Sequence, residues 1–405
     1  MGARDRDEEA NRGATPMGLT PAAALVAVLQ LSLSSSGGAA LEEVRPELGT
    51  QVPANAGVVA SDAPPRQLTG TPWTLRIGPQ RPDLVRYNRV EALSLGVRGQ
   101  VRLGSMSYTA TARFGLGDRT PSLRLDAVSE SLDLRFTQGI YYELAAIDER
   151  ARHFGVANSL TALLLGQDDG DYYRRVGLTW EWTPPSARAR TFRLRGFAEF
   201  HRAVAKETDV QLSRLWDDDA SFRPNIGAES SAEIGASLEL AHRWGTDRGQ
   251  TRGGVGTFLQ AAATPGDDYD YVRASGAADV TLALPARMSL TFETEAGTAW
   301  GSPSRQRLWY VGGPLTLRGF DPRAAGGESF GRGRAELDRS FSFGRLVLFS
   351  DVAWAGDRTD IDVDDSLSSA GVGLAVIDGI LRIDGAWRLD SSRRFRLDVY
   401  LDQIL

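Results

Sequence analysis

The sequence predicts an all-β protein, a transmembrane antiparallel β-barrel. Apolar and polar residues alternate over many segments of about 9–13 residues, which is the periodicity of a β-strand. The polar face of these segments carries Arg, Asp and Glu together. No stretch is suited to span a membrane as a helix, which takes about 20 apolar residues. A barrel with apolar side chains toward lipid and charged side chains toward its lumen fits all three observations.

Residues 1–40 are typical of a signal peptide. Arg4 and Arg6 precede an apolar run over 19–33, and small residues that suit cleavage follow this run. A disordered, Ala-rich tail is the other interpretation of this segment, and Met17 is an alternative start of translation. We therefore expect an exported protein.

Residues 41–72 predict a linker, because they are rich in Pro, Ala, Gly and acidic residues and show no periodicity. About 30 residues are fewer than a folded periplasmic module of ordinary domain size requires. The alternation begins near Trp73 and continues to the end of the sequence. The predicted β-barrel domain therefore covers 73–405.

The segment 190–203 illustrates the alternation on which the barrel prediction depends. Phe192 and Leu194 alternate there with Arg193 and Arg195. A soluble β-sandwich also alternates, but its strands average about 5–6 residues and its polar face meets water. Strands are predicted at 89–99, 106–116, 121–128, 131–138, 171–183, 190–203, 229–243, 252–263, 270–285, 287–299, 332–343, 345–355, 367–376, 379–389 and 393–404.

One further strand is expected, because bacterial single-chain barrels normally have an even number of strands. It lies at 74–79 or at 157–165. The second segment is equally compatible with a short helix, since its apolar run does not alternate. We expect sixteen strands, with twelve to fourteen as the alternative.

Composition excludes several classes of partner and site. The chain has 405 residues, a formal net charge of −6, and a single lysine, Lys206. A slightly acidic chain without basic runs argues against nucleic acid as a partner. The absence of cysteine excludes disulfides and thiolate metal sites. Acidic segments such as 360–365 lack the spacing of a calcium-binding loop, so we expect no metal and no other cofactor.

Enzymatic activity is not expected. Hydrolases and acyltransferases of this architecture need a histidine with a nucleophile or acid partner, and the histidines are His153, His201 and His242. No Gly-x-Ser-x-Gly motif is present to expose a nucleophilic serine on a strained turn. The sequence therefore offers no catalytic residue.

The Gly-rich loop after 287–299 contains a candidate functional arginine, Arg318. Strand periodicity places Glu336 and Asp351 on the lumen face of the next two predicted strands. A loop folded into the lumen would bring Arg318 to both carboxylates and form charge-assisted hydrogen bonds. The alternative is an extracellular loop with a solvated arginine. We name this candidate set the loop latch; its members are Leu317, Arg318, Gly319, Phe320, Glu336 and Asp351, with the loop glycines Gly312 and Gly313.

This loop and the strands after it resemble the BamA/TamA superfamily of outer-membrane proteins, the bacterial surface antigen barrels. The family's loop motif, Val/Ile-Arg-Gly-Phe/Tyr, is similar to 317–320, with Leu in the first position. Residues 349–353, Phe-Ser-Asp-Val-Ala, resemble its Phe-x-Asp-x-Gly strand motif, with Ala in place of the glycine. Glu336 resembles the acidic residue of the preceding strand. Residues 87–91, Tyr-Asn-Arg-Val-Glu, resemble the first barrel strand of related surface antigens.

The resemblance implies a sixteen-stranded outer-membrane barrel that inserts or translocates client polypeptides. In that family the first and last strands meet at a weakly paired seam, and POTRA modules capture clients in the periplasm. The linker is too short for one such module, so the chain resembles a member without POTRA modules. The implied partners are outer-membrane lipid and lipopolysaccharide, client polypeptides, and the barrel assembly machinery that would insert the chain as a monomer. A passive pore or structural barrel without translocase activity is the alternative.

Overall fold

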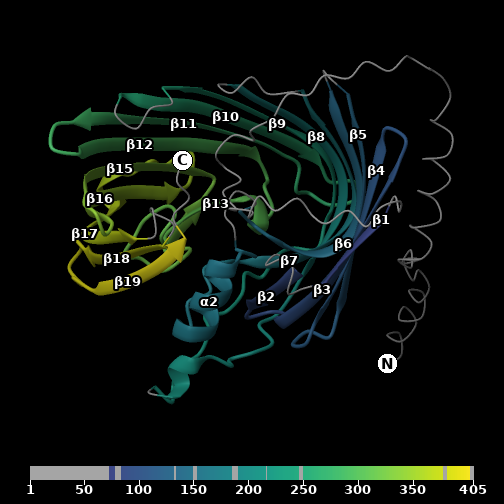
Figure 1. The fold of residues 1–405 in the computed structure, drawn as a ribbon, viewed down its shortest axis with the longest axis horizontal. Helices are drawn as coiled ribbons and strands as arrows, with labels where there is room; N and C mark the ends of the chain where they lie inside the picture. The colour runs from purple at the N-terminus through teal and green to yellow at the C-terminus, as the bar shows by residue number, and fades with distance from the viewer. Residues whose placement is uncertain are drawn as a thin grey trace, which may run out of the picture. The chain divides into compact units, whose positions relative to one another are not determined.

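The structure is a computed structural model that describes residues 73–77, 84–131, 134–148, 153–184, 190–215, 217–245, 250–376 and 381–401. Figure 1 shows long strands that follow one another side by side around a curved wall. The predicted signal peptide, 1–40, and the predicted linker, 41–72, lie outside the described residues.

Nearly all of the described secondary structure is strand. The strands are β1 (Trp73–Ile77), β2 (Val85–Asn88), β3 (Ala92–Leu103), β4 (Met106–Gly115), β5 (Pro121–Glu130), β6 (Arg135–Ala146), β7 (Tyr172–Thr183), β8 (Arg190–Ala203), β9 (Ala232–Trp244), β10 (Arg252–Ala263), β11 (Tyr271–Leu284), β12 (Met288–Gly301), β13 (Trp309–Val311), β14 (Ala325–Gly327), β15 (Ser329–Ser340), β16 (Arg345–Gly356), β17 (Leu367–Val376), β18 (Leu381–Arg388) and β19 (Phe395–Leu401). The helical segments are α2 (Val156–Leu165) and the short 3-10 turns η3 (Leu212–Leu215), η4 (Arg305–Arg307) and η5 (Val363–Asp365).

Strands that are neighbours in the sequence pair antiparallel with one another throughout the wall. Pairing runs in chain order from β3 to β12. It then passes from β12 to β15 and continues in order to β19. Strands β13 and β14 form a separate two-stranded sheet within the connection between β12 and β15. This meander is the topology expected of an up-and-down barrel.

The first strand of the wall is interrupted. β1 pairs with Val97–Val101 of β3, and β2 pairs with Ala92–Leu95 of the same strand. Both lie on the edge of β3 that does not face β4, so they occupy one position in the wall. The large sheet has 17 strands, and these therefore fill sixteen positions. The predicted all-β antiparallel barrel is confirmed, and 74–79 rather than 157–165 supplies the additional strand.

The two faces of a strand follow the predicted parity, as β16 illustrates. Leu346, Leu348 and Val352 are about half exposed on the outer face. Between them, Phe349 and Asp351 are buried on the inner face. Exposed leucines and a buried aspartate are the inverse of a soluble strand, and they suit a wall between lipid and a polar lumen.

The structure decides one open alternative and corrects one strand boundary. Residues 157–165 lie in the helix α2, which was one of the two alternatives for this segment, and glycines mark its start at Gly155 and its end at Gly166. Gly166 has a φ of 69° and closes the helix with backbone hydrogen bonds to Ala162 and Thr161, as is common at a helix C-terminus. The strand predicted at 131–138 begins at Arg135 and extends to Ala146. Polar and apolar residues are mixed over 139–146 without regular alternation, so the second half of this strand was not predicted.

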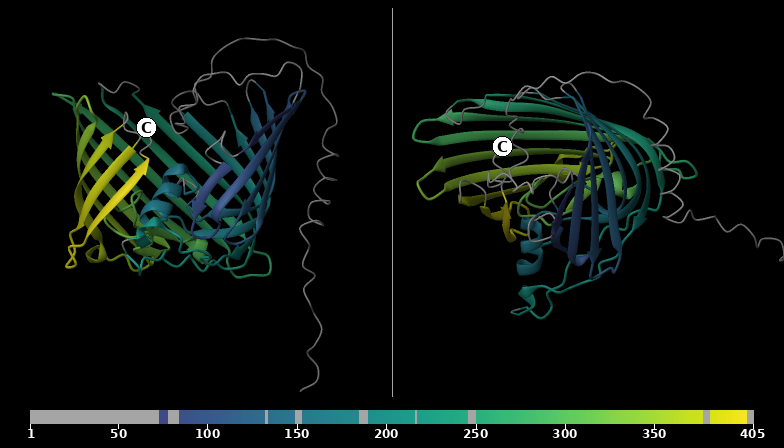
Figure 2. Two further views of the ribbon diagram at one scale, coloured as in Figure 1. Left: turned by 60° about the horizontal axis from the view of Figure 1, so that its bottom comes forward. Right: turned by 45° about the vertical axis from the view of Figure 1, so that its right-hand side comes forward.

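The connections are long on one end of the wall and short on the other. The long ones include 147–171, which contains α2, then 204–231 and 302–328. Figure 2 shows these segments gathered at the end of the barrel where α2 lies. In the part of the chain that the structure describes, no helix is both long enough and apolar enough to cross a membrane.

Candidate functional site

The connection 302–328 carries the loop latch into the barrel. It leaves β12 at Gly301, passes through η4 and β13, turns at 312–320 and returns through β14 to β15. β13 and β14 contact β15 and β16, so this hairpin lies against the wall. The loop is therefore folded into the barrel and does not extend as a solvated arm.

Glycines allow the tight turn at the tip of this hairpin. Gly312 has a φ of 125° and Gly313 a φ of 80°, in the region that side chains with a Cβ rarely adopt. A Cβ on Gly312 would lie 2.1 Å from the carbonyl oxygen of Asp321. The Thr316 hydroxyl accepts a hydrogen bond from the Gly312 amide at 2.8 Å, and the Gly313 amide donates to the Phe320 carbonyl at 2.9 Å. These bonds bring both ends of the turn together.

Two apolar residues on either side of Arg318 hold the turn in place. Leu317 is fully buried and Phe320 is 3% exposed. Both belong to a cluster of buried side chains that joins the hairpin to the wall, and its other members are Trp309, Val311, Phe330 and Ala353. Gly319, at a φ of 83°, lies against Ala386 of β18, where a Cβ would approach the Ala386 side chain to 3.1 Å. The packing of these neighbours thus fixes the backbone of Arg318, in addition to the ion pairs that its guanidinium forms.

Arg318 is fully buried and reaches the two carboxylates that the sequence pointed to. Its Nε and Nη2 donate to the two oxygens of Asp351 at 2.7 and 2.5 Å, a bidentate arrangement. Its backbone amide donates to the same carboxylate at 3.1 Å. Its Nη1 donates to Glu336 at 2.5 Å. The Phe349 ring covers the guanidinium at 3.6 Å.

Three residues of this centre were not predicted. Asp384 of β18 accepts from Arg318 Nη1 at 3.2 Å. Arg382 donates to Glu336 at 2.7 Å, and Arg334 donates to Asp351 at 3.1 Å. The centre therefore combines three arginines with three carboxylates and is balanced in charge. Arg382 and Asp384 alternate with the apolar Leu381 and Ile383, a pattern that puts both on the lumen face, but nothing in the sequence gave their distance from Arg318.

The surroundings keep Arg318 charged. Burial by itself lowers the pKa of a guanidinium, but the hydrogen bonds and the charge of Asp351 outweigh burial and raise the pKa of Arg318 above its usual range. The arginine is therefore a permanent cation, and its bonds to the carboxylates persist as long as those carboxylates are ionised.

A second anchor, not predicted from the sequence, holds the same loop against the opposite part of the wall. Arg307 of η4 is buried and donates to Glu233 of β9 at 2.8 Å. The adjacent Gln306 accepts from the Glu229 amide at 2.9 Å. His201 of β8 lies between Glu199, at 3.1 Å, and Glu233, at 3.2 Å, and is fully buried. This histidine belongs to an ion-pair network that holds the loop. The connection 302–328 is thus tethered at β8–β9 and at β15–β18.

The edges of the first and last strands do not pair with each other through any described residue. β19 pairs with β18 on one side, and the interrupted first strand pairs with β3. The helix α2 lies between them and contacts both β2 and β19 (Figures 1 and 2). The Tyr87 amide of β2 donates to Ser159 of the helix at 3.0 Å. Gln167, just past the helix, donates to the Leu397 carbonyl of β19 at 2.9 Å.

The distribution of polar and apolar side chains on α2 suits a position in the barrel wall. Its exposed side chains include Val156, Leu160 and Leu164, whereas its buried ones include Asn158 and Thr161. A helix on a water-soluble protein has the opposite arrangement. Asn158 donates to Asp168 at 3.0 Å, so its buried amide has a polar partner. We call the region where α2 joins β2 to β19 the seam.

The fold and these contacts define a class: a transmembrane antiparallel β-barrel with a long loop held in its lumen by buried arginines. No protein-family model and no curated protein matches the sequence. Among solved structures, BamA from Haemophilus ducreyi, crystallised without POTRA domains 1–3, is similar over 82% of this chain and 70% of its own, with a TM-score of 0.53 and 14% identity. The chain has the barrel fold of BamA, and the predicted likeness to BamA/TamA barrels is confirmed at the level of the fold.

Two further solved structures are CdiB proteins. CdiB from Acinetobacter baumannii is 11% identical over 76% of this chain, with a TM-score of 0.41, and CdiB from Escherichia coli is 14% identical over 82%, with a TM-score of 0.42. The alignments cover 56% and 62% of the two CdiB chains, which is less than two thirds of their length.

Proposed function

We propose that the protein is an outer-membrane barrel of the BamA/TamA type that inserts or translocates client polypeptides. The observation that carries the proposal is the buried Arg318, held by Glu336 and Asp351 at the positions where that family places its loop arginine and strand acids. The likeness of the fold to BamA supports it. A diffusion pore has no need for such an arginine in a loop that is tethered on two sides of the lumen.

The seam supplies the place where such a barrel would act. The free edges of β19 and of the first strand present backbone groups that can pair with the strand of another chain. α2 occupies this position and is bound to both sides by few hydrogen bonds. We propose that α2 moves when a client strand, or a client in transit, enters the seam. Outer-membrane lipid and lipopolysaccharide surround the exposed leucines, and no enzymatic step is required.

The barrel is itself a proposed client of the barrel assembly machinery and functions as a monomer. β19 alternates Phe395, Leu397 and Val399 with Arg396 and Asp398, which is the pattern of an outer-membrane barrel strand. With neighbours paired along the wall and α2 at the seam, one chain completes the barrel.

Depletion of the protein tests this function. We expect specific outer-membrane or secreted proteins to disappear from the corresponding fractions, and wild-type protein supplied in trans to restore them. The Arg318→Ala variant should fail to restore them even when it accumulates to wild-type levels. The Arg193→Ala variant is the matched control, because Arg193 forms an exposed ion pair with Glu239 on the other side of the lumen. An unchanged set of envelope and secreted proteins after depletion would count against translocation or insertion.

A passive pore is the second candidate function. It is favoured by a polar cavity of about 560 Å³ on the lumen side of β3–β7. Planar-bilayer recordings distinguish the two. A steady conductance that Arg318→Ala leaves unchanged favours the pore, whereas closed or fluctuating channels that this substitution opens favour the tethered loop as a gate.

A further inference from the structure

A groove of about 470 Å³ lies in the wall where β8, β9 and β10 run side by side (Figure 1). Six of the side chains that line it alternate along these strands with lumen-facing ones: Arg190, Phe192, Leu240, His242, Val255 and Thr257. Arg193 and Glu239, which are adjacent in sequence to Phe192 and Leu240, form their ion pair on the lumen side. The groove therefore opens on the outer face of the wall, toward lipid.

The strand register orders the outward side chains of this region into rows. The row at the start of β8 contains the basic groups and consists of Arg190, His242 and Val255. The next two rows are almost entirely apolar and consist of Phe192, Leu240 and Thr257, then Leu194, Leu238 and Leu259. Directly opposite residues on one face of an antiparallel pair have Cβ atoms about 4.5–5.5 Å apart. Arg190 and His242 can therefore bind one ligand together.

None of the side chains in these three rows is a carboxylate, so the rows supply no acid to Arg190. The lumen face of β8 differs, since Arg193 pairs there with Glu239 at 3.1 Å and lies 3.7 Å from Glu181. An arginine beside apolar surface keeps its stem on that surface and its charged group at the polar boundary. Arg190 and the exposed His242 thus suit an anion that carries an apolar part of its own.

Two tryptophans place the basic row at the level of the lipid headgroups. Trp182 of β7 packs edge-on against Phe192, with ring centroids 4.9 Å apart, and Trp244 of β9 lies 6.3 Å from His242. Tryptophan is enriched where a membrane meets water. The connections at this end, 184–189 and 245–251, are short, and short turns of such barrels face the periplasm. The groove therefore faces the leaflet that phospholipids form.

We propose that this groove binds an anionic phospholipid, with its phosphate on Arg190 and His242 and an acyl chain along the apolar rows. A guanidinium can make two parallel bonds to a phosphate, and the imidazole can donate a further one. Basic groups above apolar rows match the charged headgroup and the acyl chain of one lipid. The site lies on β8–β10, in the middle of the sequence of strands, and is separate from the seam. The proposal does not depend on insertion or translocation of clients.

Fluorescence quenching in vesicles tests the proposal, because brominated acyl chains quench nearby tryptophans. Brominated phosphatidylglycerol, as a minor component of phosphatidylcholine vesicles, should quench the full chain more strongly than brominated phosphatidylcholine does at the same fraction. The double variant Arg190→Gln, His242→Gln should lose this excess, and Trp182→Phe, Trp244→Phe should lose most of it. Arg339→Gln is the matched control and should keep it, because Arg339 also faces outward at this end of the barrel but lies on β15, outside the groove.

A further variant separates the shape of the groove from its charge. Thr257→Phe fills the row beside Leu240 and should reduce the excess quenching, whereas Thr294→Phe on the outer face of β12 should keep it. Each variant should retain the heat-dependent change in electrophoretic mobility of a folded barrel.

Three results would overturn the proposal: equal quenching of the wild type by the two lipids, an excess that the double glutamine variant keeps, or an equal loss in Arg339→Gln. A wild type that is dimeric in neutral detergent, together with a monomeric double glutamine variant, would also overturn it and would assign the groove to a second copy of the chain.

Discussion

Arg318 is both charged and fully buried, a combination that is stable only because buried carboxylates surround it. A buried guanidinium needs carboxylates, and buried carboxylates need cations, since each charge loses its hydration. Asp351 takes three hydrogen bonds from Arg318 alone, and Glu336 is shared between Arg318 and Arg382. Such a pair adds little net stability compared with apolar packing, but removal of one partner leaves an unpaired buried charge. The arginine therefore fixes where the loop lies.

Arg318→Ala is expected to destabilise the folded barrel by about 3–5 kcal/mol, because Asp351 and Glu336 lose their shared cation. Arg318→Lys should recover only part of this, since an ammonium cannot make the bidentate bond. Denaturant unfolding in detergent measures both. The exposed pair of Arg193 with Glu239 is the control, and Arg193→Ala should cost about 0–1 kcal/mol. Equal effects of the two alanine substitutions would contradict a buried, tethered loop.

Among the elements, α2 differs from its surroundings, since it is a helix in a wall of strands. Its apolar residues face outward and its polar residues inward, so it follows the same polarity rule as the strands that it joins. A helix satisfies its own backbone hydrogen bonds. It can therefore move out of the seam without exposing a row of unpaired backbone groups of its own. An element of this kind is suited to move, whereas a paired strand is not.

Cross-linking tests whether the seam must open. Asp169, after α2, pairs with Arg396 of β19 at 3.1 Å, and the chain has no cysteine to interfere. We expect Asp169→Cys, Arg396→Cys joined by a reducible bismaleimide to lose function in the depletion strain, and reduction to restore it. Arg193→Cys, Glu239→Cys joins two strands that are already paired, so it should function when linked. Full activity of the linked seam variant would show that α2 stays in place.

For the whole molecule, the outer surface decides in which solvent the fold is stable. Apolar side chains such as Leu95, Leu125 and Leu348 are about half exposed around the wall, while charged residues fill the lumen. In water this distribution would expose a large apolar surface and favour aggregation. In a bilayer the same surface is solvated by lipid, and the strands satisfy their backbone groups through their neighbours.

Leu348→Arg should therefore destabilise the barrel in lipid vesicles by about 2–4 kcal/mol if the residue lies near the middle of the bilayer. Ile361→Arg is the matched control, because Ile361 is equally apolar and 62% exposed but lies in the connection between β16 and β17. It should have little effect. Equilibrium unfolding from vesicles measures both, and two neutral substitutions would indicate that the outer face of β16 meets water.

The sequence predicted much of the fold because the alternation of residues along a strand shows directly which side chains lie on each of its two faces. Period-two alternation located the strands of the wall, and it placed Glu336 and Asp351 on the face that Arg318 reaches. It failed where the local pattern was ambiguous. The apolar run of 157–165 does not alternate, and the first strand is broken between β1 and β2, so the pattern left open which of the two segments forms a strand.

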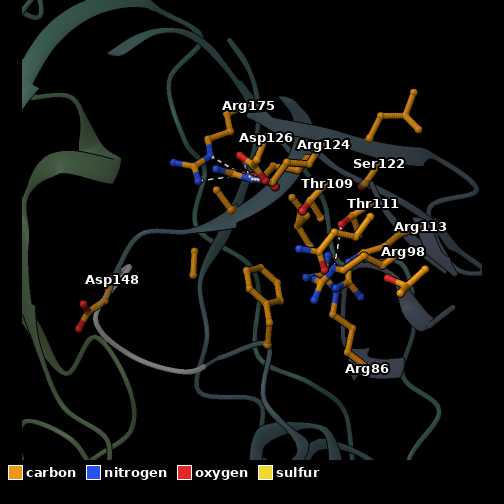
Figure 3. Close-up of a pocket in the computed structure, with 18 residues that line it drawn as sticks. Arg86, Arg98, Thr109, Thr111, Arg113, Ser122, Arg124, Asp126, Asp148 and Arg175 are labelled. Atoms are coloured by element: carbon orange, nitrogen blue, oxygen red, sulfur yellow. Dashed lines mark hydrogen bonds and ion pairs between the residues drawn. The ribbon is translucent and has the colours of Figure 1, made fainter. Parts of the chain in front are cut away.

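Polarity and period are properties of neighbouring residues, so the sequence by itself determined the class of fold, the orientation of each strand and the candidate arginine. Which charges meet across the lumen depends on the tilt and stagger of strands far apart in the chain. Only the tertiary structure therefore brought Asp384 to Arg318 and Glu233 to Arg307. It also placed α2 between the first and last strands and gathered the residues that line the polar cavity of Figure 3, because these contacts join segments that no local pattern connects.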